Sequence, residues 1–347
     1  MKTTTQDLLT AARVLLRAPC RNESASSFVG AGTKLAVISD EASEELADAL
    51  LEACRELRGV GESCSLDTPG TAEVEGPRPH KVLPLDTVRA LHGAGAVVYV
   101  ARALPAEWAM RQQLRSYVLQ RGLRHAHLPD ITQTAFVRGL SSEIEAVVTG
   151  GHVLVERLKG VRSVAVASAQ GTALTLTFAD GIPWIPRLGE IVVGESVGFP
   201  AGHLIGSPES VDGVFVANAS LGEFFGAREG LLADRPVRFT LEKGHVMRVE
   251  AASRELEADL SRTLSIAANS NRVGAVVVGA NQGIAAPTGE VVVDQNRPGL
   301  HLIIGSAPRR SFGMTWSART SFTACQSDCR VTFDGEVVIE HGRFVCP

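Results

Sequence analysis

The pattern of apolar residues changes near Val161, and this change constrains the fold more than any other feature of the chain. Before it, a run that suits a buried strand, such as Lys34–Ser39, is followed by a helical pattern, such as Glu41–Leu57. A strand that leads into a helix is typical of a parallel sheet covered by helices. After it, short strands follow one another. We therefore predict an N-terminal α/β domain with a parallel sheet over residues 1–160 and a larger β-rich (α+β) domain over residues 161–347.

The N-terminal half also contains a long segment without a strand or helix pattern. Asp67–Pro84 is rich in proline and is expected to form a loop. The helices expected in this half are Asp7–Arg17, Glu41–Leu57, Leu85–Leu91, Ala106–Arg121, Ile131–Arg138 and Ser142–Leu158, and the strands are Lys34–Ser39, Gly61–Leu66 and Ala96–Val100.

The C-terminal half combines short β-branched runs with pairs of a polar residue and glycine. Such pairs favour the tight turns of β-hairpins. The pairs are Asp180-Gly181, Asp212-Gly213, Lys243-Gly244 and Asp334-Gly335. The strands expected are Val164–Ser168, Ala173–Phe178, Ile191–Val193, Val214–Val216, Val237–Leu241, His245–Glu250 and Val331–Ile339, with a helix over Leu256–Ala267.

Charge and composition exclude several classes of protein. The formal net charge is -4, so the chain has neither the basic footprint of a nucleic-acid-binding protein nor a polybasic membrane patch. No apolar run approaches the length of a membrane span. The amino-terminal stretch is polar at its start and carries charges, which favours an amphipathic helix over a signal peptide. The six cysteines are scattered, so we expect reduced thiols and a cytoplasmic protein.

Polar side chains in Val273–Phe312 follow short strands that end at glycines. Val276–Val278 stops at Gly279, Leu300–Ile304 stops at Gly305, and Val291–Val293 is expected to form another strand. Polar residues on such loops often form a site. The alternative is a hairpin layer in the core, with its histidine a satisfied core residue. The candidate residues are Asn281, His301, Arg309 and Arg310.

The same stretch resembles the metal-binding half of the thermophilic metallo-aminopeptidases, the aminopeptidase T family. The family's Gly-x-Asn segment, Thr-Gly loop and histidine strand are matched by Gly279–Asn281, Thr288-Gly289 and Gly299–Gly305. Phe199–Ser220 and Val331–Phe344 resemble its Pro-x-Gly-Glu segment and its closing hairpin. The resemblance covers most of the chain and is specific from about residue 165 onward. It implies the fold and the homodimer of that family.

The ligands of the family's dinuclear metal site are largely missing. The resemblance places His203 and Ala275 where the family has glutamates, and of the ligands only the histidine remains, as His301. No histidine follows His301 until the closing hairpin, so the family's His-x-Asp pair is absent too. Two hard metal ions need several anionic ligands, so we expect no metal and no cofactor. The residues at the positions of the missing pair are Ser321 and Thr323.

The sequence offers two other candidate metal sites. His203, His301 and Asp328 would supply the two histidines and one carboxylate of a mononuclear iron site. The related dihydroxypyridine dioxygenases use this scaffold with such an iron, but they take their carboxylate from the missing pair. Cys325 and Cys329 would share one face of a strand, and a structural role is favoured for them.

A scaffold that is retained without its metal ligands indicates a protein that binds a peptide but does not hydrolyse it. Arginines and a tryptophan lie where the family lines its substrate cleft, and such residues bind carboxylates and apolar groups. A solvated basic loop with a core tryptophan is the alternative. We predict a non-catalytic peptide-binding protein; the other function considered is a metal-dependent aminopeptidase or a mononuclear-iron oxygenase with rewired ligands. The predicted peptide-binding residues are His203, Asn281, His301, Arg309, Arg310, Trp316 and Arg319.

The predicted ligand is an acidic or carboxylate-ended peptide that carries an apolar or aromatic side chain. Part of it is expected to add to a strand edge near Leu300–Ile304. The chain is also similar to the peptide-binding proteins of crocagin biosynthesis, a ribosomal-peptide pathway. That similarity implies a precursor peptide as ligand and modifying enzymes of the same pathway as partners. We further predict a homodimer formed through the β-rich half, because edge strands need covering.

Overall fold

The computed structural model describes residues 3–21, 27–67, 78–307 and 309–345. The chain divides into two compact units. The first comprises Met1–Ala146 and Gly189–Pro200, and the second comprises Val147–Leu188 and Ala201–Pro347. The division falls within α6 (Ile144–Leu158), and a short later segment belongs to the first unit. The domain boundary at residue 160 stays a prediction.

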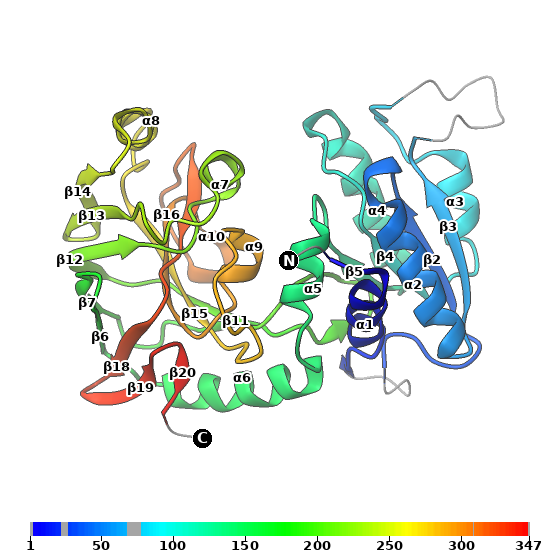
Figure 1. The fold of residues 1–347 in the computed structure, drawn as a ribbon, viewed down its shortest axis with the longest axis horizontal. Helices are drawn as coiled ribbons and strands as arrows, with labels where there is room; N and C mark the ends of the chain where they lie inside the picture. The colour runs from blue at the N-terminus through cyan, green and yellow to red at the C-terminus, as the bar shows by residue number, and fades with distance from the viewer. Residues whose placement is uncertain (1–2, 22–26, 68–77, 308, 346–347) are drawn as a thin grey trace. The chain divides into compact units, whose positions relative to one another are not determined.

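The first unit is built on a five-stranded sheet in the order β10-β5-β4-β2-β3, in which every neighbouring pair is parallel (Figure 1). Its strands are β2 (Lys34–Ser39), β3 (Val60–Ser65), β4 (Ala96–Tyr99), β5 (Arg124–His127) and β10 (Ser196–Gly198), and β1 (Cys20–Arg21) pairs with β9 (Ile191–Val192). Its helices are α1 (Thr5–Leu16), α2 (Glu44–Glu56), α3 (Leu85–Leu91), α4 (Trp108–Arg121) and α5 (Gln133–Gly139), with single 3-10 turns η1 (Glu41–Ser43) and η2 (Pro105–Glu107).

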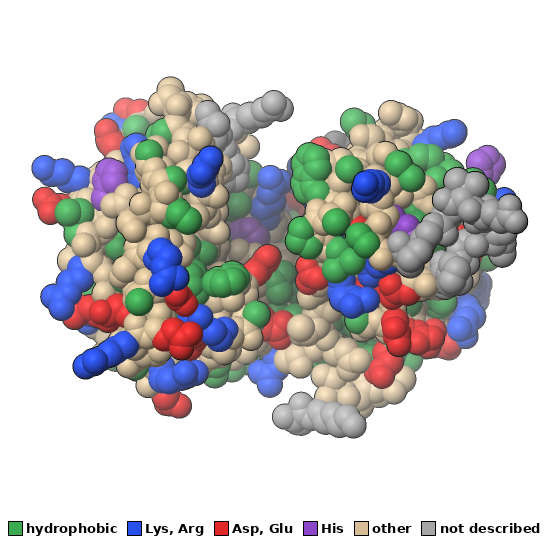
Figure 2. Space-filling view, turned by 90° about the horizontal axis from the view of Figure 1, so that it is seen from above, with side chains coloured by type: hydrophobic (Ala, Val, Ile, Leu, Met, Phe, Trp, Pro, Cys, Tyr) green, Lys and Arg blue, Asp and Glu red, His purple; other side chains and the backbone are tan. Residues whose placement is uncertain are grey.

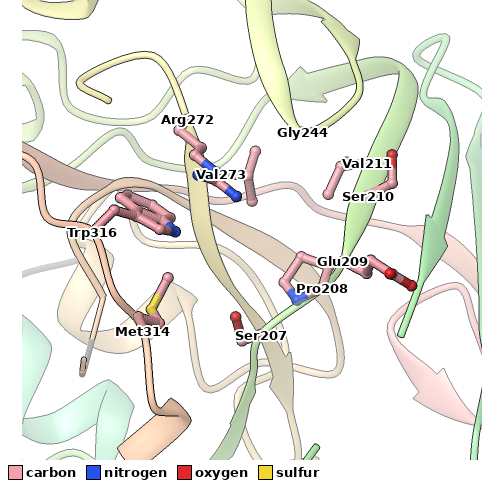
Figure 3. Close-up of a pocket in the computed structure, with 10 residues that line it drawn as sticks. All are labelled: Ser207, Pro208, Glu209, Ser210, Val211, Gly244, Arg272, Val273, Met314 and Trp316. Carbon is pink, nitrogen blue, oxygen red and sulfur yellow. The ribbon is translucent and has the colours of Figure 1, made fainter. Parts of the chain in front are cut away.

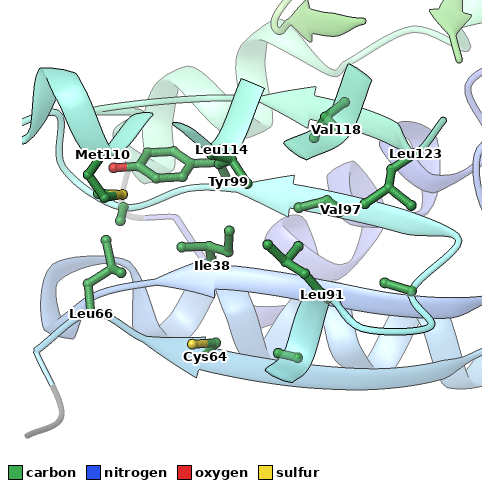
Figure 4. Packing of buried hydrophobic residues seen from close by; sticks show 14 residues of the cluster. Ile38, Cys64, Leu66, Leu91, Val97, Tyr99, Met110, Leu114, Val118 and Leu123 are labelled. Atoms are coloured by element: carbon green, nitrogen blue, oxygen red, sulfur yellow. The ribbon is translucent and has the colours of Figure 1, made fainter. Parts of the chain in front are cut away.

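One face of this sheet packs against α3 and α4. The side chains of Val97 and Tyr99 on β4 meet Leu114 and Val118 of α4, and Leu91 of α3 lies over β2 (Figure 4). The residues of β4 are all buried. A strand that is buried along its whole length lies inside a sheet whose two faces are covered. This arrangement agrees with the predicted parallel α/β architecture of the N-terminal half.

A buried ion network lies where β2 ends. The guanidinium of Arg78 donates to Asp40 at 2.6 Å and to Glu107 at 2.8 Å, and all three side chains are buried. Asp40 also accepts hydrogen bonds from Arg102. Burial alone would raise the pKa of Asp40, but the hydrogen bonds from Arg102 and Arg78 hold it well below its usual value. The network fixes Arg78 against the sheet.

The second unit contains two antiparallel sheets. The five-stranded sheet has the order β17-β16-β15-β11-β8, and the eight-stranded sheet has the order β14-β13-β12-β7-β6-β18-β19-β20. The first is formed by β8 (Ile185–Arg187), β11 (His203–Gly206), β15 (Val273–Gly279), β16 (Gly299–Gly305) and β17 (Ser321–Ala324). The second is formed by β6 (Ser163–Ser168), β7 (Ala173–Thr177), β12 (Ser210–Ala217), β13 (Val237–Glu242), β14 (His245–Glu250), β18 (Cys329–Phe333), β19 (Glu336–Glu340) and β20 (Arg343–Phe344). The other helices are α7 (Glu223–Glu229), α8 (Arg254–Ser265), α9 (Val291–Asp294) and α10 (Arg309–Phe312).

Two predictions for this unit are wrong in detail. The run Val291–Val293 forms the single helical turn α9 and not a strand, because Asp294 accepts hydrogen bonds from the backbone of Thr288 and Gly289 and closes the turn. Gly213 lies inside β12 with a φ of +118° and does not form a turn between strands. By contrast, Lys243-Gly244 joins β13 to β14 with positive φ at both residues, as a tight hairpin requires.

The distribution of charged side chains on the surface agrees with the nearly balanced charge of the sequence. On the face seen in Figure 2, basic and acidic side chains are interspersed over both units. Among the described residues, no helix is long and apolar enough to cross a membrane.

Candidate functional site

Three of the predicted site residues gather around the turn that precedes β16. The ring of His203 donates from Nδ1 to Asn296 Oδ1 at 2.6 Å, and Nε2 of His301 donates to the carbonyl oxygen of Arg297 at 3.2 Å. The backbone N–H of Asn281 donates to the carbonyl of Asn296 at 2.8 Å. His203, Asn281 and His301 are all buried.

Both histidines are held neutral. Burial lowers the pKa of His203 to about 4, although the hydrogen bond with Asn296 by itself raises this pKa. Burial also lowers the pKa of His301 to about 4. Nδ1 of His301 accepts a hydrogen bond from the backbone N–H of Gln326 at 3.3 Å, which requires an unprotonated nitrogen there. These contacts use both ring nitrogens of His301.

The residues around these histidines do not fit a dinuclear metal centre. Ala275 packs in an aliphatic cluster with Ile205 and Val277, where the resemblance would place a carboxylate. Nowhere in the described ranges do three or more His, Cys, Asp or Glu side chains gather in a way that would hold a metal ion. The alternative iron set is therefore not assembled: the carboxylate of Asp328 pairs with Arg297 at 2.8 Å. The absence of a metal in the protein itself stays a prediction.

The two cysteines of interest do not share a strand face. β17 ends at Ala324 and β18 begins at Cys329, so Cys325 lies in the connection between them. Both side chains are buried, and burial raises the pKa of the Cys329 thiol to about 11. A buried, protonated thiol packs as a small apolar group, in agreement with the structural role favoured for this pair.

The remaining predicted residues lie in other places. Arg309 and Arg310 begin α10, and their side chains lie outside the described part of the structure. Trp316 lines a small cavity beside the start of β15, and Arg319 lines a larger one beside β17. The predicted residues whose side chains are described are therefore divided between a buried turn and two separate cavities.

The larger cavity, of about 600 Å³, lies beside the edge strand β17. Part of its wall is β17 and the two residues before it, from Arg319 to Thr323. The rest comes from α7, from Thr263 of α8, and from the turn around α9. The apolar side chains on the wall are Phe224, Phe225, Val291, Val292 and Phe322, and the charged ones are Glu223 and Arg319.

The edge of β17 is only partly covered. Gly222 donates to the carbonyl of Thr323 at 2.8 Å, and Cys325 donates to the carbonyl of Ser220 at 2.9 Å. Backbone groups alternate in direction along an antiparallel strand, so those of Ser321 point the same way as those of Thr323, away from β16. The described part of the structure offers the backbone of Ser321 no hydrogen bond on that side. Hydrogen-bonding groups of the main chain thus face the cavity.

The strand edge expected near Leu300–Ile304 does not exist. These residues belong to β16, which pairs with β15 on one side and with β17 on the other. The available edge is one strand further out. Phe224, which is 77% exposed and lines the cavity, is not among the residues predicted from the sequence. The sequence shows two adjacent phenylalanines, but only the structure of α7 shows that one of them is exposed and the other is buried.

Comparisons with known proteins bear on the fold. No protein-family model matches the chain, and no curated protein sequence matches it. The 2,5-dihydroxypyridine dioxygenase from Pseudomonas putida is similar in structure, with a TM-score of 0.64 and 16% identity over 100% of this chain and 99% of that one. AmpT, the aminopeptidase T of Thermus thermophilus, has a TM-score of 0.61 and 15% identity over 99% of this chain and 100% of that one. The chain therefore has an aminopeptidase T-like fold, which the dioxygenase shares.

Proposed function

We propose that this protein binds a peptide without hydrolysing it, along the open edge of β17. The observation that carries the proposal is the cavity of about 600 Å³ whose wall includes Ser321 of the edge strand β17. In the described part of the structure, the backbone of Ser321 has no hydrogen bond on the side away from β16. A peptide in an extended conformation adds to such an edge through main-chain hydrogen bonds. The backbone of Ser321 supplies a donor and an acceptor for this pairing.

The cavity walls favour an apolar side chain in the ligand. The exposed ring of Phe224 lies 5.2 Å from that of Phe225, edge to face, and Phe225 packs in turn on Phe322. Covering an exposed aromatic ring with a ligand side chain removes apolar surface from water. This supports the predicted apolar or aromatic residue of the peptide.

The charged side chains around the cavity give less support to the prediction that the peptide is acidic or ends in a carboxylate. Glu223 and Arg319 both line the wall and both are exposed. A solvent-exposed arginine contributes at most about 1 kcal/mol to an ion pair. Loss of Arg319 should therefore weaken binding by less than the tenfold expected of a shielded contact.

The residues that surround His203 and His301 support binding without catalysis. Both rings form hydrogen bonds with the turn before β16, and Ala275, in an aliphatic cluster, occupies a position where the family resemblance would place a carboxylate. We propose that the protein presents its peptide to partner enzymes in a cytoplasm, as a homodimer. The similarity of the sequence to the crocagin peptide-binding proteins suggests a ribosomal precursor peptide as the ligand.

The test begins with a display library of short random peptides, followed by calorimetry with the most enriched peptide. Phe224→Ser should weaken its binding by about tenfold, because burial of an aromatic side chain contributes about 1.5–3 kcal/mol. Met247→Ser is the matched control, since Met247 is 62% exposed in the same unit and does not line the cavity. N-methylation of the peptide at successive positions should weaken binding at alternate residues.

Several outcomes would count against this function. Failure to enrich any peptide, or equal affinity of the enriched peptide for Phe224→Ser and the unchanged protein, would remove the β17 edge as the binding site. Mass spectrometry of the peptide after prolonged incubation addresses catalysis. Cleavage or oxidation by the protein would favour the enzyme alternative.

A further inference from the structure

A second cavity in the second unit has features that the proposed function does not use. It has a volume of about 190 Å³ and lies beside the start of β15 (Figure 3). A cavity of about 150 Å³ is large enough to hold benzene. The space therefore accepts one group of side-chain size and not a folded segment.

A stacked arginine forms part of the wall. The guanidinium carbon of Arg272 lies 4.4 Å from the ring centroid of Trp316, within the range of a cation–π contact. In the described part of the chain, no hydrogen bond or ion pair engages the Arg272 side chain. Stacking involves the face of the guanidinium and leaves the N–H groups on its edge available. Two of these N–H groups can donate parallel hydrogen bonds to one carboxylate.

The position of this arginine is fixed before any ligand arrives. Its backbone N–H donates to Asn269 at 3.1 Å, and its carbonyl accepts from Gly305 at 2.7 Å. The side chain of Asn269 also donates to the carbonyl of Ser317 at 3.2 Å, which holds the loop that carries Trp316. A site built on fixed elements loses little conformational entropy when it binds.

The other walls are apolar, and the one acid is turned away. Val211 and Val273 are buried, and Met314 lies across from them (Figure 3). Glu209 is exposed, and Figure 3 shows its carboxylate directed away from Arg272. An apolar pocket with a single guanidinium matches a singly charged carboxylate that carries a hydrocarbon group. A phosphate dianion would find no second cationic donor among the lining residues.

We propose that this cavity, the Arg272–Trp316 pocket, binds the carboxylate of a molecule that ends in an apolar residue, such as the carboxyl terminus of a peptide. The carboxylate pairs with the edge of the Arg272 guanidinium, and the apolar group lies against Val211, Val273 and Met314. The site is separate from the β17 edge, and the inference does not depend on peptide binding there.

Fluorescence of Trp316 tests this directly, in a protein whose other tryptophans, Trp108 and Trp184, are replaced by Phe. The probes are N-acetyl-L-leucine, N-acetyl-L-leucinamide and inorganic phosphate. N-acetyl-L-leucine should bind saturably, with a Kd in the millimolar range expected of so small a ligand. The amide and phosphate should bind at least about tenfold more weakly, because neither offers a singly charged carboxylate beside an apolar group.

Variants confirm the position of the site. Arg272→Met should weaken the binding of N-acetyl-L-leucine by about tenfold or more, and Arg272→Lys should recover part of it, since lysine keeps the charge and loses the fork. Arg248→Met is the control, because Arg248 is an exposed arginine of the same unit that pairs with Glu250. Phe224→Ser should leave this binding unchanged, which distinguishes the pocket from the β17 cavity.

Four results would overturn the proposal. They are no saturable change with N-acetyl-L-leucine up to tens of millimolar, equal binding of the amide, equal binding of phosphate, and undiminished binding in a folded Arg272→Met protein. Circular dichroism establishes whether each variant is folded. If Arg272→Met does not fold, undiminished binding in folded Arg272→Lys would overturn the proposal in its place.

Discussion

The buried histidines of the second unit should make its stability depend on pH in a defined direction. The pKa of His301 is lowered from 6.5 to about 4 in the folded protein. Between these values the unfolded chain binds a proton that the folded chain does not. The free energy of unfolding therefore is highest above pH 6.5 and falls as the pH is lowered towards 4.

The magnitude follows from the two pKa values. At pH 5 the lowered pKa of His301 reduces the free energy of unfolding by about 2 kcal/mol relative to pH 7.5, and His203, lowered to about 4 as well, contributes a similar amount. The structural reason is plain at His301, where Nδ1 accepts the N–H of Gln326. A proton on that nitrogen would place two N–H groups against each other in a buried site.

The assay compares the protein with His301→Gln. Glutamine offers one amide donor and one carbonyl acceptor, as the neutral ring does, but it does not titrate. Urea unfolding is followed at pH 7.5 and pH 5 by the tryptophans of the second unit in a Trp108→Phe background. The stability lost between the two pH values should be smaller in His301→Gln by about 2 kcal/mol. Equal losses in the two proteins would refute the assignment of a buried neutral imidazole.

Three further predictions concern stability, metal and assembly. Arg78→Met should lower the free energy of unfolding of the first unit by about 3–5 kcal/mol, because the buried carboxylate of Glu107 would lose its ion-pair partner and Asp40 would keep only Arg102. The exposed Arg89→Met, measured by the same denaturant series, should change it little. Elemental analysis of the purified protein should find far less than one metal ion per chain, and about one ion per chain that resists mild chelation would contradict the ligand argument. Light scattering at micromolar concentration should give the mass of a dimer, whereas a monomer would contradict the assembly inferred from the family resemblance.

Much of the local structure was determined by the sequence, because local periodicity and turn chemistry act over a few residues. The run of β4 has no charged side chain on either face, and it forms a strand buried along its whole length. Lys243-Gly244 forms its hairpin because both residues adopt positive φ. The run Val291–Val293 shows the limit, since a carboxylate cap from Asp294 outweighs the strand preference of three valines.

The sequence also offered candidate residues for a binding site, but it did not determine how they are arranged. The family resemblance predicted from the sequence that His203 and Ala275 replace glutamates, that a His-x-Asp pair is absent, and that His301 remains. Only the tertiary structure decided that His301 is a core residue with both ring nitrogens engaged, that β16 lies inside its sheet, and that β17 forms the edge. The tertiary structure also decided that Arg272 lies beside Trp316. Strand order and cavity walls arise from pairings between distant segments, which side-chain periodicity along one segment does not specify.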